Sequence, residues 1–270
     1  MTATATATAT IRAGADHRTR IERAVAARGV AVGTSVGLGI PEGIAVAAAA
    51  GLDFVQIDGE HTHLPIDTIN TAAALAAALD IAVLVRVPEV TATAVTHTLA
   101  TGVTGIIAPR IETRSQAEAL VRHAHLPPRG TRGVGGRRPL HEPAHSEQDE
   151  RHTQLWIIIE TARGIEHLAE ILAVRGISAV LPGPFDLSYD LGVPGRVDHP
   201  TVRAGVDEIY RVCVEQGVPV IGSHTTEPGG ARTAHRKGAR LLLAPADTGV
   251  LQRAHAANRA EIMAAVTDSG

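Results

Sequence analysis

The feature that most constrains this chain is a regular alternation between short apolar runs and longer alanine-rich or amphipathic stretches. Eight short runs rich in β-branched residues recur, and most are apolar at every position, as in parallel strands that are covered on both faces. We expect strands at 31–36, 54–57, 82–87, 105–108, 155–159, 179–181, 219–222 and 241–244. We expect helices at 42–50, 65–78, 92–101, 115–124, 164–174, 201–216, 229–238 and 247–267.

Eight strand–helix units predict a closed (β/α)8 barrel, the TIM-barrel architecture, as a single domain. Glycine, which tolerates the left-handed conformation just past a helix, follows several expected helices: Gly51, Gly102, Gly176, Gly217 and Gly238. A doubly wound open sheet is the alternative, but no GxGxxG motif follows the first strand. We assign residues 30–270 to the barrel and residues 1–29 to a tail and a leading helix.

One stretch, residues 127–153, breaks the alternation and is rich in Gly, Pro, Arg and His. It follows the fourth expected helix and precedes the fifth strand. Long excursions in compact domains are usually functional or disordered. A lid, a subunit contact and a mobile loop are therefore equally open interpretations.

The bulk composition excludes several classes of partner. A net charge of −3 and an aromatic content of 2% give no basis for nucleic-acid binding. No window reaches the roughly 18 apolar residues of a membrane span. The N-terminal "MTATATATAT" lacks the basic and leucine-rich regions of a signal peptide. A single cysteine, Cys213, fits a reducing compartment, so we expect a cytoplasmic protein.

Polar residues cluster where the expected strands end, which is where barrels carry their active sites. Each residue alone has an ordinary structural explanation, but a barrel gathers its strand ends around one mouth. The residues concerned are Asp58, Glu60 and His61 after the second strand, Arg86 in the third, Glu160 after the fifth, Asp186 after the sixth, and Ser223 and His224 at the seventh. Five strand ends with such side chains indicate a site.

The chemistry of these residues favours a metal-assisted reaction. Glu160 and Asp186 offer hard oxygen ligands that suit Mg²⁺ or Mn²⁺, whereas zinc would require more His or Cys. An aspartate such as Asp58 can accept the proton of one imidazole nitrogen of His61 and leave the other as a base. Arg86 offers a forked donor for a carboxylate or an enolate oxygen.

The position of the single lysine argues against a Schiff-base mechanism. The only lysine, Lys237, ends a helix just before the eighth strand, at the barrel face opposite the mouth. A Schiff-base mechanism is therefore excluded as an interpretation, and any enolate would need a metal to stabilise it.

Seven motifs, in order, resemble those of the HpcH/HpaI family of class II pyruvate aldolases. They are "GLDFVQIDGEHTH", "VLVRVP", "GIIAPRIETRSQAEALV", "PPRGTRGVGG", "IIIET", "LPGPFDLSYDLG" and "DTGVL". The resemblance covers roughly residues 30–252. It implies a (β/α)8 barrel, a homo-oligomer that is usually a hexamer, and a divalent metal, with Mg²⁺, Mn²⁺ or Co²⁺ as candidates.

The resemblance also assigns roles to individual residues. Glu160 and Asp186 match the metal ligands, His61 matches the base, and Asp58 matches the acid that orients it. Arg86 matches the arginine that holds the keto or enolate oxygen of pyruvate, and the backbone amides of Phe185 and Asp186 would bind the pyruvate carboxylate.

Some positions depart from the family pattern. Ile158 replaces a glutamine beside the metal glutamate, Ala100 replaces an aspartate, and no aromatic residue follows the arginine in "RVPEV". His224 stands where small or apolar residues are common, so we assign it a contribution to acceptor choice. A solvated loop histidine is an equally good interpretation of that residue.

We therefore predict a lyase that joins or cleaves a pyruvate-type enolate and an aldehyde. Its partners are a small 2-oxo acid and an aldehyde, without nucleic acid or membrane. One alternative is a metal-dependent decarboxylase of oxaloacetate or a similar acid, which needs no acceptor. A second is a catalytically idle family member that binds a small acid, for which Ile158 and Ala100 are the support.

Overall fold

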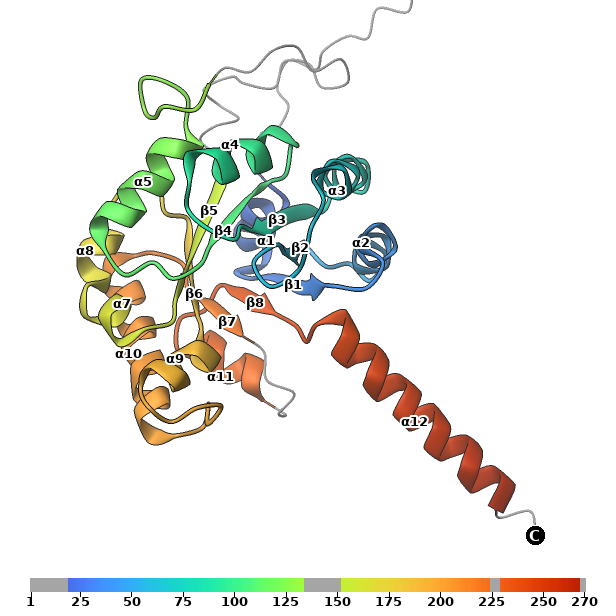
Figure 1. The fold of residues 1–270 in the computed structure, drawn as a ribbon. Coiled ribbons are helices and arrows are strands. Elements are labelled where there is room, and N and C mark those ends of the chain that lie inside the picture. Colours follow the sequence, from blue (N-terminus) through green and yellow to red (C-terminus); the bar gives the residue numbers. More distant parts are fainter. Residues whose placement is uncertain (1–18, 134–151, 224–228, 268–270) are drawn as a thin grey trace, which may run out of the picture.

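Eight parallel strands form one sheet in the computed structural model, which describes residues 19–133, 152–223 and 229–267 (Figure 1). The strands are β1 (Ala31–Val36), β2 (Phe54–Asp58), β3 (Ala82–Arg86), β4 (Gly105–Ala108), β5 (Gln154–Ile159), β6 (Ala179–Pro182), β7 (Ile221–Ser223) and β8 (Leu241–Leu243). Their order is β6-β5-β4-β3-β2-β1-β8-β7. A parallel bridge between Val180 and Val220 joins β6 to the residue before β7, so the barrel is nearly closed. The predicted (β/α)8 barrel is confirmed, and the open-sheet alternative is wrong.

Helices alternate with these strands, and all except α1 and α12 pack around the outside of the barrel (Figure 1). They are α1 (Arg20–Arg28), α2 (Ile40–Ala49), α3 (Ile66–Ala78), α4 (Ala92–Ala100), α5 (Arg114–Ala124), α7 (Ala162–Glu166), α8 (Leu168–Leu172), α9 (Pro184–Asp190), α10 (Pro200–Gln216), α11 (Gly230–Arg236) and α12 (Asp247–Thr267). Every predicted strand and helix is present with ends within two residues, except that the helix expected at 164–174 is split into α7 and α8. The five predicted helix-terminal glycines all take left-handed φ angles, from 67° at Gly217 to 115° at Gly176.

Large side chains fill the inside of the barrel. Alternate residues of each strand point inward, and an interior cluster includes Phe54, Leu84, Ile107 and Trp156. The rings of Phe54 and Trp156 meet edge to face with centroids 5.2 Å apart. Gly33 makes room for this pair, because a Cβ there would lie 2.2 Å from the Phe54 ring. The interior of the barrel is thus a packed apolar core, and the polar mouth lies at the end where the strands finish.

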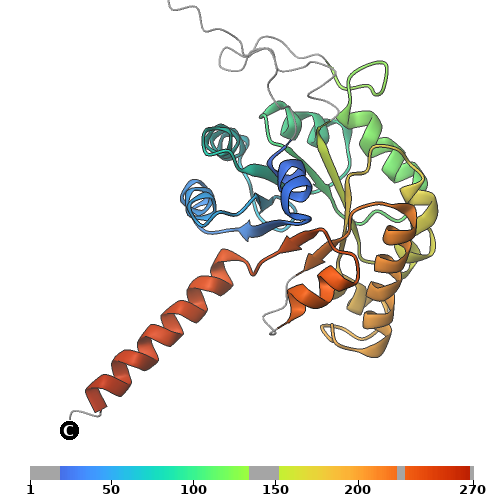
Figure 2. The same ribbon diagram turned by 180° about the vertical axis from the view of Figure 1, so that it is seen from behind.

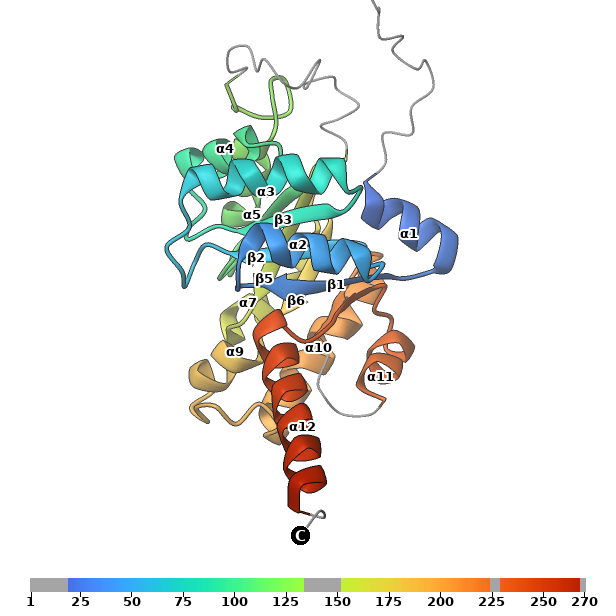
Figure 3. The ribbon, with the colours of Figure 1, turned by 90° about the vertical axis from the view of Figure 1, so that its right-hand side faces the viewer.

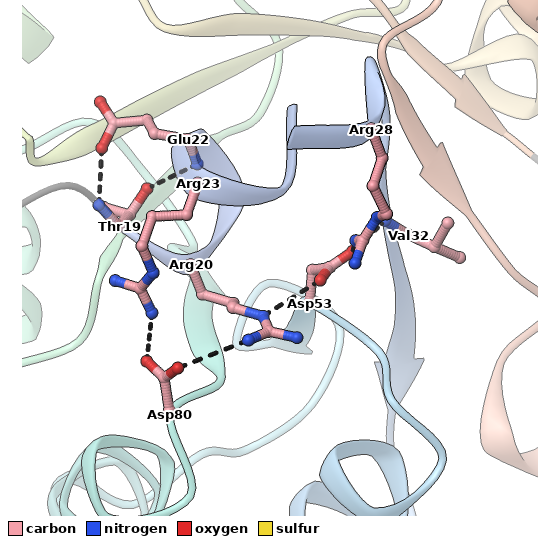
Figure 4. Close-up of polar contacts among 8 residues, drawn as sticks. All are labelled: Thr19, Arg20, Glu22, Arg23, Arg28, Val32, Asp53 and Asp80. Carbon is pink, nitrogen blue, oxygen red and sulfur yellow. Dashed lines mark hydrogen bonds and ion pairs between the residues drawn. The ribbon is translucent and has the colours of Figure 1, made fainter. Parts of the chain in front are cut away.

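Helix α1 covers the end of the barrel at which the strands begin, seen from behind in Figure 2. Its Ile21 is 3% exposed and belongs to the interior cluster. The buried carboxylate of Asp53 accepts hydrogen bonds from Arg20 Nε at 3.1 Å, from Arg28, and from the Val32 backbone N–H at 2.9 Å (Figure 4). A buried carboxylate with these partners ties α1 to β1 and to the residue before β2.

Helix α12 has no buried residue and extends away from the barrel (Figures 1 and 3). It exposes large apolar side chains: Val250, Leu251, Ile262, Met263 and Val266. Apolar side chains gathered on one helix are typical of a surface that another chain covers. In the described part of the chain, no helix has the length and apolarity that crossing a membrane requires.

Candidate functional site

The second and third strands bring an ion pair to the barrel mouth. Asp58 and Arg86 are direct neighbours in the β2–β3 register and both point inward. Arg86 Nε lies 2.9 Å from Asp58 Oδ1, and Arg86 Nη2 lies 2.5 Å from Asp58 Oδ2. The third nitrogen, Nη1, lies 3.1 Å from Glu60 Oε2. Two carboxylates therefore hold the guanidinium in one orientation, and the paired geometry is of the strong bidentate kind.

The structure places the His61 imidazole beside Glu60 and not beside Asp58, so the orienting role of Asp58 stays a prediction. Asp58 Oδ1 instead accepts the backbone N–H groups of Glu60, at 2.9 Å, and His61, at 3.2 Å. The imidazole is 61% exposed, and its Nε2 lies 3.6 Å from Glu60 Oε2. The physical reason is that Arg86, directly opposite in register, offers Asp58 two charge-assisted donors. The role of His61 as a base stays a prediction.

Both members of the pair remain ionised at neutral pH. Burial alone would raise the pKa of Asp58, but hydrogen bonds from Arg86 and from the Glu60 backbone, together with the Arg86 charge, lower it. Burial would likewise lower the pKa of Arg86, but the hydrogen bond and charge of Asp58 and the charges of Glu60 and Glu160 raise it. The mouth of the barrel thus carries one positively charged group, Arg86, near the carboxylates of Asp58, Glu60 and Glu160.

Glu160 is the most buried of the carboxylates predicted to form the site, with 4% exposure. Its Oε1 accepts the backbone N–H of Arg110 at 2.8 Å, and Arg110 takes a left-handed φ of 50°. Burial raises the pKa of Glu160, and so do the negative charges of Asp186 and Glu60, while the Arg110 N–H and the Arg86 charge oppose them. A bound cation would relieve this repulsion.

The surroundings of Glu160 fit a divalent cation. Glu160 Oε2 has no hydrogen-bond partner among the described residues. Gly183 leaves the space beside it open, because a Cβ there would lie 2.9 Å from that oxygen. Within the described ranges no group of three or more His, Cys, Asp or Glu residues could hold a metal. Two carboxylates suit Mg²⁺ or Mn²⁺, which usually keep several waters, better than they suit zinc.

Asp186 and Phe185 lie in the first turn of α9, a helix that was not predicted from the sequence. The first intrahelical bond there is from the Leu187 N–H to the Gly183 carbonyl. The backbone N–H groups of Phe185 and Asp186 are therefore not used by the helix, as their predicted role with a carboxylate requires. His224 lies outside the described residues, as does most of the 127–153 stretch.

Three further predicted features have clear positions. Ile158 is 3% exposed, points into the barrel and belongs to its apolar interior. Ala100 is exposed at the last position of α4. Lys237 follows α11 and pairs with Asp207 at 2.5 Å on the outside of the barrel. This position agrees with its predicted place away from the mouth.

The sequence interpretation gave no role to three residues. The sequence places Glu60 at a strand end, but nothing in the sequence predicts its contact with Arg86. The left-handed Arg110 carries no sequence signal, because only its backbone acts on Glu160. Gln56 was detectable, since a polar residue within the apolar run of β2 is unusual for a buried strand.

Comparison with known proteins gives consistent results. Residues 36–254 match the family model HpcH/HpaI aldolase/citrate lyase. The chain is 31% identical over 211 residues to a hydroxypyruvate/pyruvate aldolase of Roseobacter denitrificans, covering 75% of this chain and 80% of that protein. It is 31% identical to a 4-hydroxy-2-oxovalerate aldolase of Rhodococcus jostii, covering 86% and 91%. The crystal structure of an HpcH/HpaI aldolase from Desulfitobacterium hafniense superposes with a TM-score of 0.82 at 32% identity, over 90% of this chain and 96% of that one.

Proposed function

The chain belongs to the HpcH/HpaI aldolase/citrate lyase family, and we propose that it is a divalent-metal-dependent aldolase. It cleaves or forms the carbon–carbon bond between a pyruvate-type enolate and an aldehyde. The observation that carries the proposal is the mouth itself, where Glu160 lies near both the Asp186 carboxylate and a guanidinium fixed by Asp58 and Glu60. Relatives of about 30% identity that are named as aldolases support the same reaction class.

Glu160 and Asp186 would hold the cation, with Mg²⁺ or Mn²⁺ favoured by the oxygen ligands and Co²⁺ as a third candidate. When bound, the cation would supply positive charge that stabilises the negative charge developing as the carbon–carbon bond breaks. The Arg110 N–H holds one Glu160 oxygen in place and leaves the other free to bind.

The substrate would be held by groups that are already oriented. Arg86 faces the keto oxygen with a charge that Asp58 and Glu60 keep in position. The free N–H groups of Phe185 and Asp186 receive the carboxylate at the start of α9. His61, exposed at the rim beside Glu60, moves the proton of the aldol hydroxyl.

The test is a coupled assay for pyruvate release from a 4-hydroxy-2-oxo acid, with added Mg²⁺ or Mn²⁺ and with chelator. We expect metal-dependent release that Glu160→Gln abolishes. Release that is unaffected by chelator would contradict the proposal.

The decarboxylase alternative is favoured by the apolar Ile158 beside Glu160, since decarboxylation needs no acceptor pocket. Release of CO₂ from oxaloacetate without any aldol cleavage would select it. An idle binder would show metal binding by calorimetry and neither reaction.

We further propose that the protein is a homo-oligomer in a reducing, cytoplasmic environment. The exposed apolar side chains of α12 support association, and a buried free thiol at Cys213 fits the compartment.

A further inference from the structure

A cavity at the mouth of the barrel adjoins the proposed site. Its volume is about 210 Å³, and its polar lining comprises Ser35, Gln56, Asp58, Thr62, Arg86, Asp247 and Thr248. Asp58 and Arg86 belong to both places, so the cavity adjoins the groups assigned to the reacting keto acid. Its size is below the usual range of drug-sized pockets and suits a molecule of a few carbon atoms.

Gln56 lines this cavity and carries a buried polar atom without a partner among the described residues. The side chain points inward from β2, and its Nε2 lies 2.7 Å from Ser35 Oγ. The other end of the amide, Oε1, is buried and has no hydrogen-bond partner among the described residues. A buried polar atom without a partner is costly, and its persistence calls for a ligand or water that completes it.

The missing partner has the character of a hydroxyl group. Ser35 could pair with either end of the amide, so the unpartnered end is an acceptor in one orientation and a donor in the other. A hydroxyl satisfies both, because it donates and accepts. At the rim, the exposed Thr248 lines the same cavity, and its hydroxyl has no partner among the described residues.

The charges around the cavity disfavour an anionic occupant. Two carboxylates, Asp58 and Asp247, line it against one guanidinium, Arg86. Asp247 is fixed there, since its Oδ2 accepts the backbone N–H groups of Gly37 and Leu38, both at 2.9 Å. Like charges close together repel strongly where water is excluded, so an uncharged molecule fits this cavity better than a second acid.

We propose that this cavity binds the acceptor aldehyde, that it selects uncharged hydroxyaldehydes, and that Gln56 is the specificity-determining residue. The proposal rests on the proposed aldolase function. A hydroxyl next to the aldehyde carbon completes the hydrogen bonding of Gln56, while the carbonyl faces the neighbouring keto-acid site at Arg86.

The test compares the condensation of pyruvate with three aldehydes in the presence of Mn²⁺. Glycolaldehyde and acetaldehyde differ by one hydroxyl, and glyoxylate adds a negative charge. We expect kcat/KM for glycolaldehyde to exceed that for acetaldehyde by about tenfold, the worth of one hydrogen bond. Glyoxylate should be the poorest acceptor.

Gln56→Leu should lower kcat/KM for glycolaldehyde until it matches that for acetaldehyde, which removes the preference. Gln216→Leu, the same change at an exposed position at the end of α10, is the matched control and should keep the preference. Thr248→Val tests the cavity at an exposed position that the fold tolerates, and should weaken the preference in the same direction.

Exchange of the pyruvate methyl protons in D₂O distinguishes failure of the cavity assignment from failure of the proposed aldolase function. If the parent protein catalyses exchange but Gln56→Leu lowers kcat/KM for both aldehydes alike, or if glyoxylate is the best acceptor, the cavity assignment is overturned and the aldolase stands. If the parent catalyses no exchange, the proposed function fails and this assignment fails with it.

Discussion

Gly183→Ala is the perturbation whose effect the structure specifies most closely. A methyl group at this position would lie 2.6 Å from Glu160 Cβ, 2.9 Å from Glu160 Oε2 and 3.1 Å from Ile158 Cγ2. Ordinary carbon–carbon contacts are about 3.5–4.0 Å, so the Glu160 side chain must move by about 1 Å. The φ of Gly183 is −105°, which alanine adopts without strain, so the effect comes from crowding alone.

This displacement should lower both the free energy of unfolding and the affinity for the metal. Overpacking at a well-packed position costs about 1–3 kcal/mol of unfolding free energy. Moving a carboxylate that must bind Mg²⁺ or Mn²⁺ with near-ideal geometry should weaken metal affinity by about 10–100-fold. Titration calorimetry with Mn²⁺ measures the affinity, and urea unfolding measures the stability.

Gly249→Ala is the matched control, because a Cβ there meets only Arg253 Nη1 at 3.4 Å on the exposed helix α12. It should leave the metal affinity unchanged. If Gly183→Ala binds Mn²⁺ with the parent affinity, the reasoning that crowding of Glu160 disturbs the metal site is refuted.

Three further predictions concern other parts of the molecule. His61→Ala should lower turnover by about 10²-fold with unchanged metal affinity; full activity in the pyruvate-release assay would exclude it as the base. The lowered pKa of Asp58 means that its carboxylate adds stability above the unfolded-state pKa, about 3.9, and loses it as pH falls through the lower folded-state value. The deficit of Asp58→Asn in urea unfolding should therefore shrink between pH 7 and pH 3, and a constant deficit would refute the ion-pair account. Ile262→Glu with Val266→Glu, one turn apart on the exposed face of α12, should reduce the mass measured by light scattering; a monomeric parent would contradict the proposed association.

The sequence predicted the barrel well because its signals are local. Apolar runs mark most of the strands, and glycines such as Gly176 and Gly217 mark helix ends at the positions where left-handed φ angles occur. Helix α9 was missed because its seven residues, Pro184–Asp190, are too short for an amphipathic period to be recognised.

The sequence predicted which residues lie at the barrel mouth, but not which of their side chains pair with one another. Residues at strand ends reach the mouth because parallel strands end together, which places Asp58, Arg86 and Glu160 correctly. Which side chains pair depends on register across strands, and the β2–β3 register sets Asp58 opposite Arg86. Two nitrogens of the Arg86 guanidinium therefore bond the Asp58 carboxylate, and the His61 imidazole does not.

The contributions of backbone groups to the site were the hardest to predict from the sequence. The left-handed Arg110 positions Glu160 through its N–H, and no residue-type rule predicts this conformation for arginine. The unsatisfied amide of Gln56 likewise depends on packing around the mouth.

We propose that Glu160 and Asp186 hold a cation that enables pyruvate to lose a methyl proton. The most direct test of this proposal is proton NMR of pyruvate in D₂O with the protein, with Mg²⁺ or Mn²⁺, with chelator, and with Glu160→Gln. We expect the methyl signal to decay only with the parent protein and metal together. A decay that persists with chelator or in Glu160→Gln, or no decay with any divalent cation, would contradict the account.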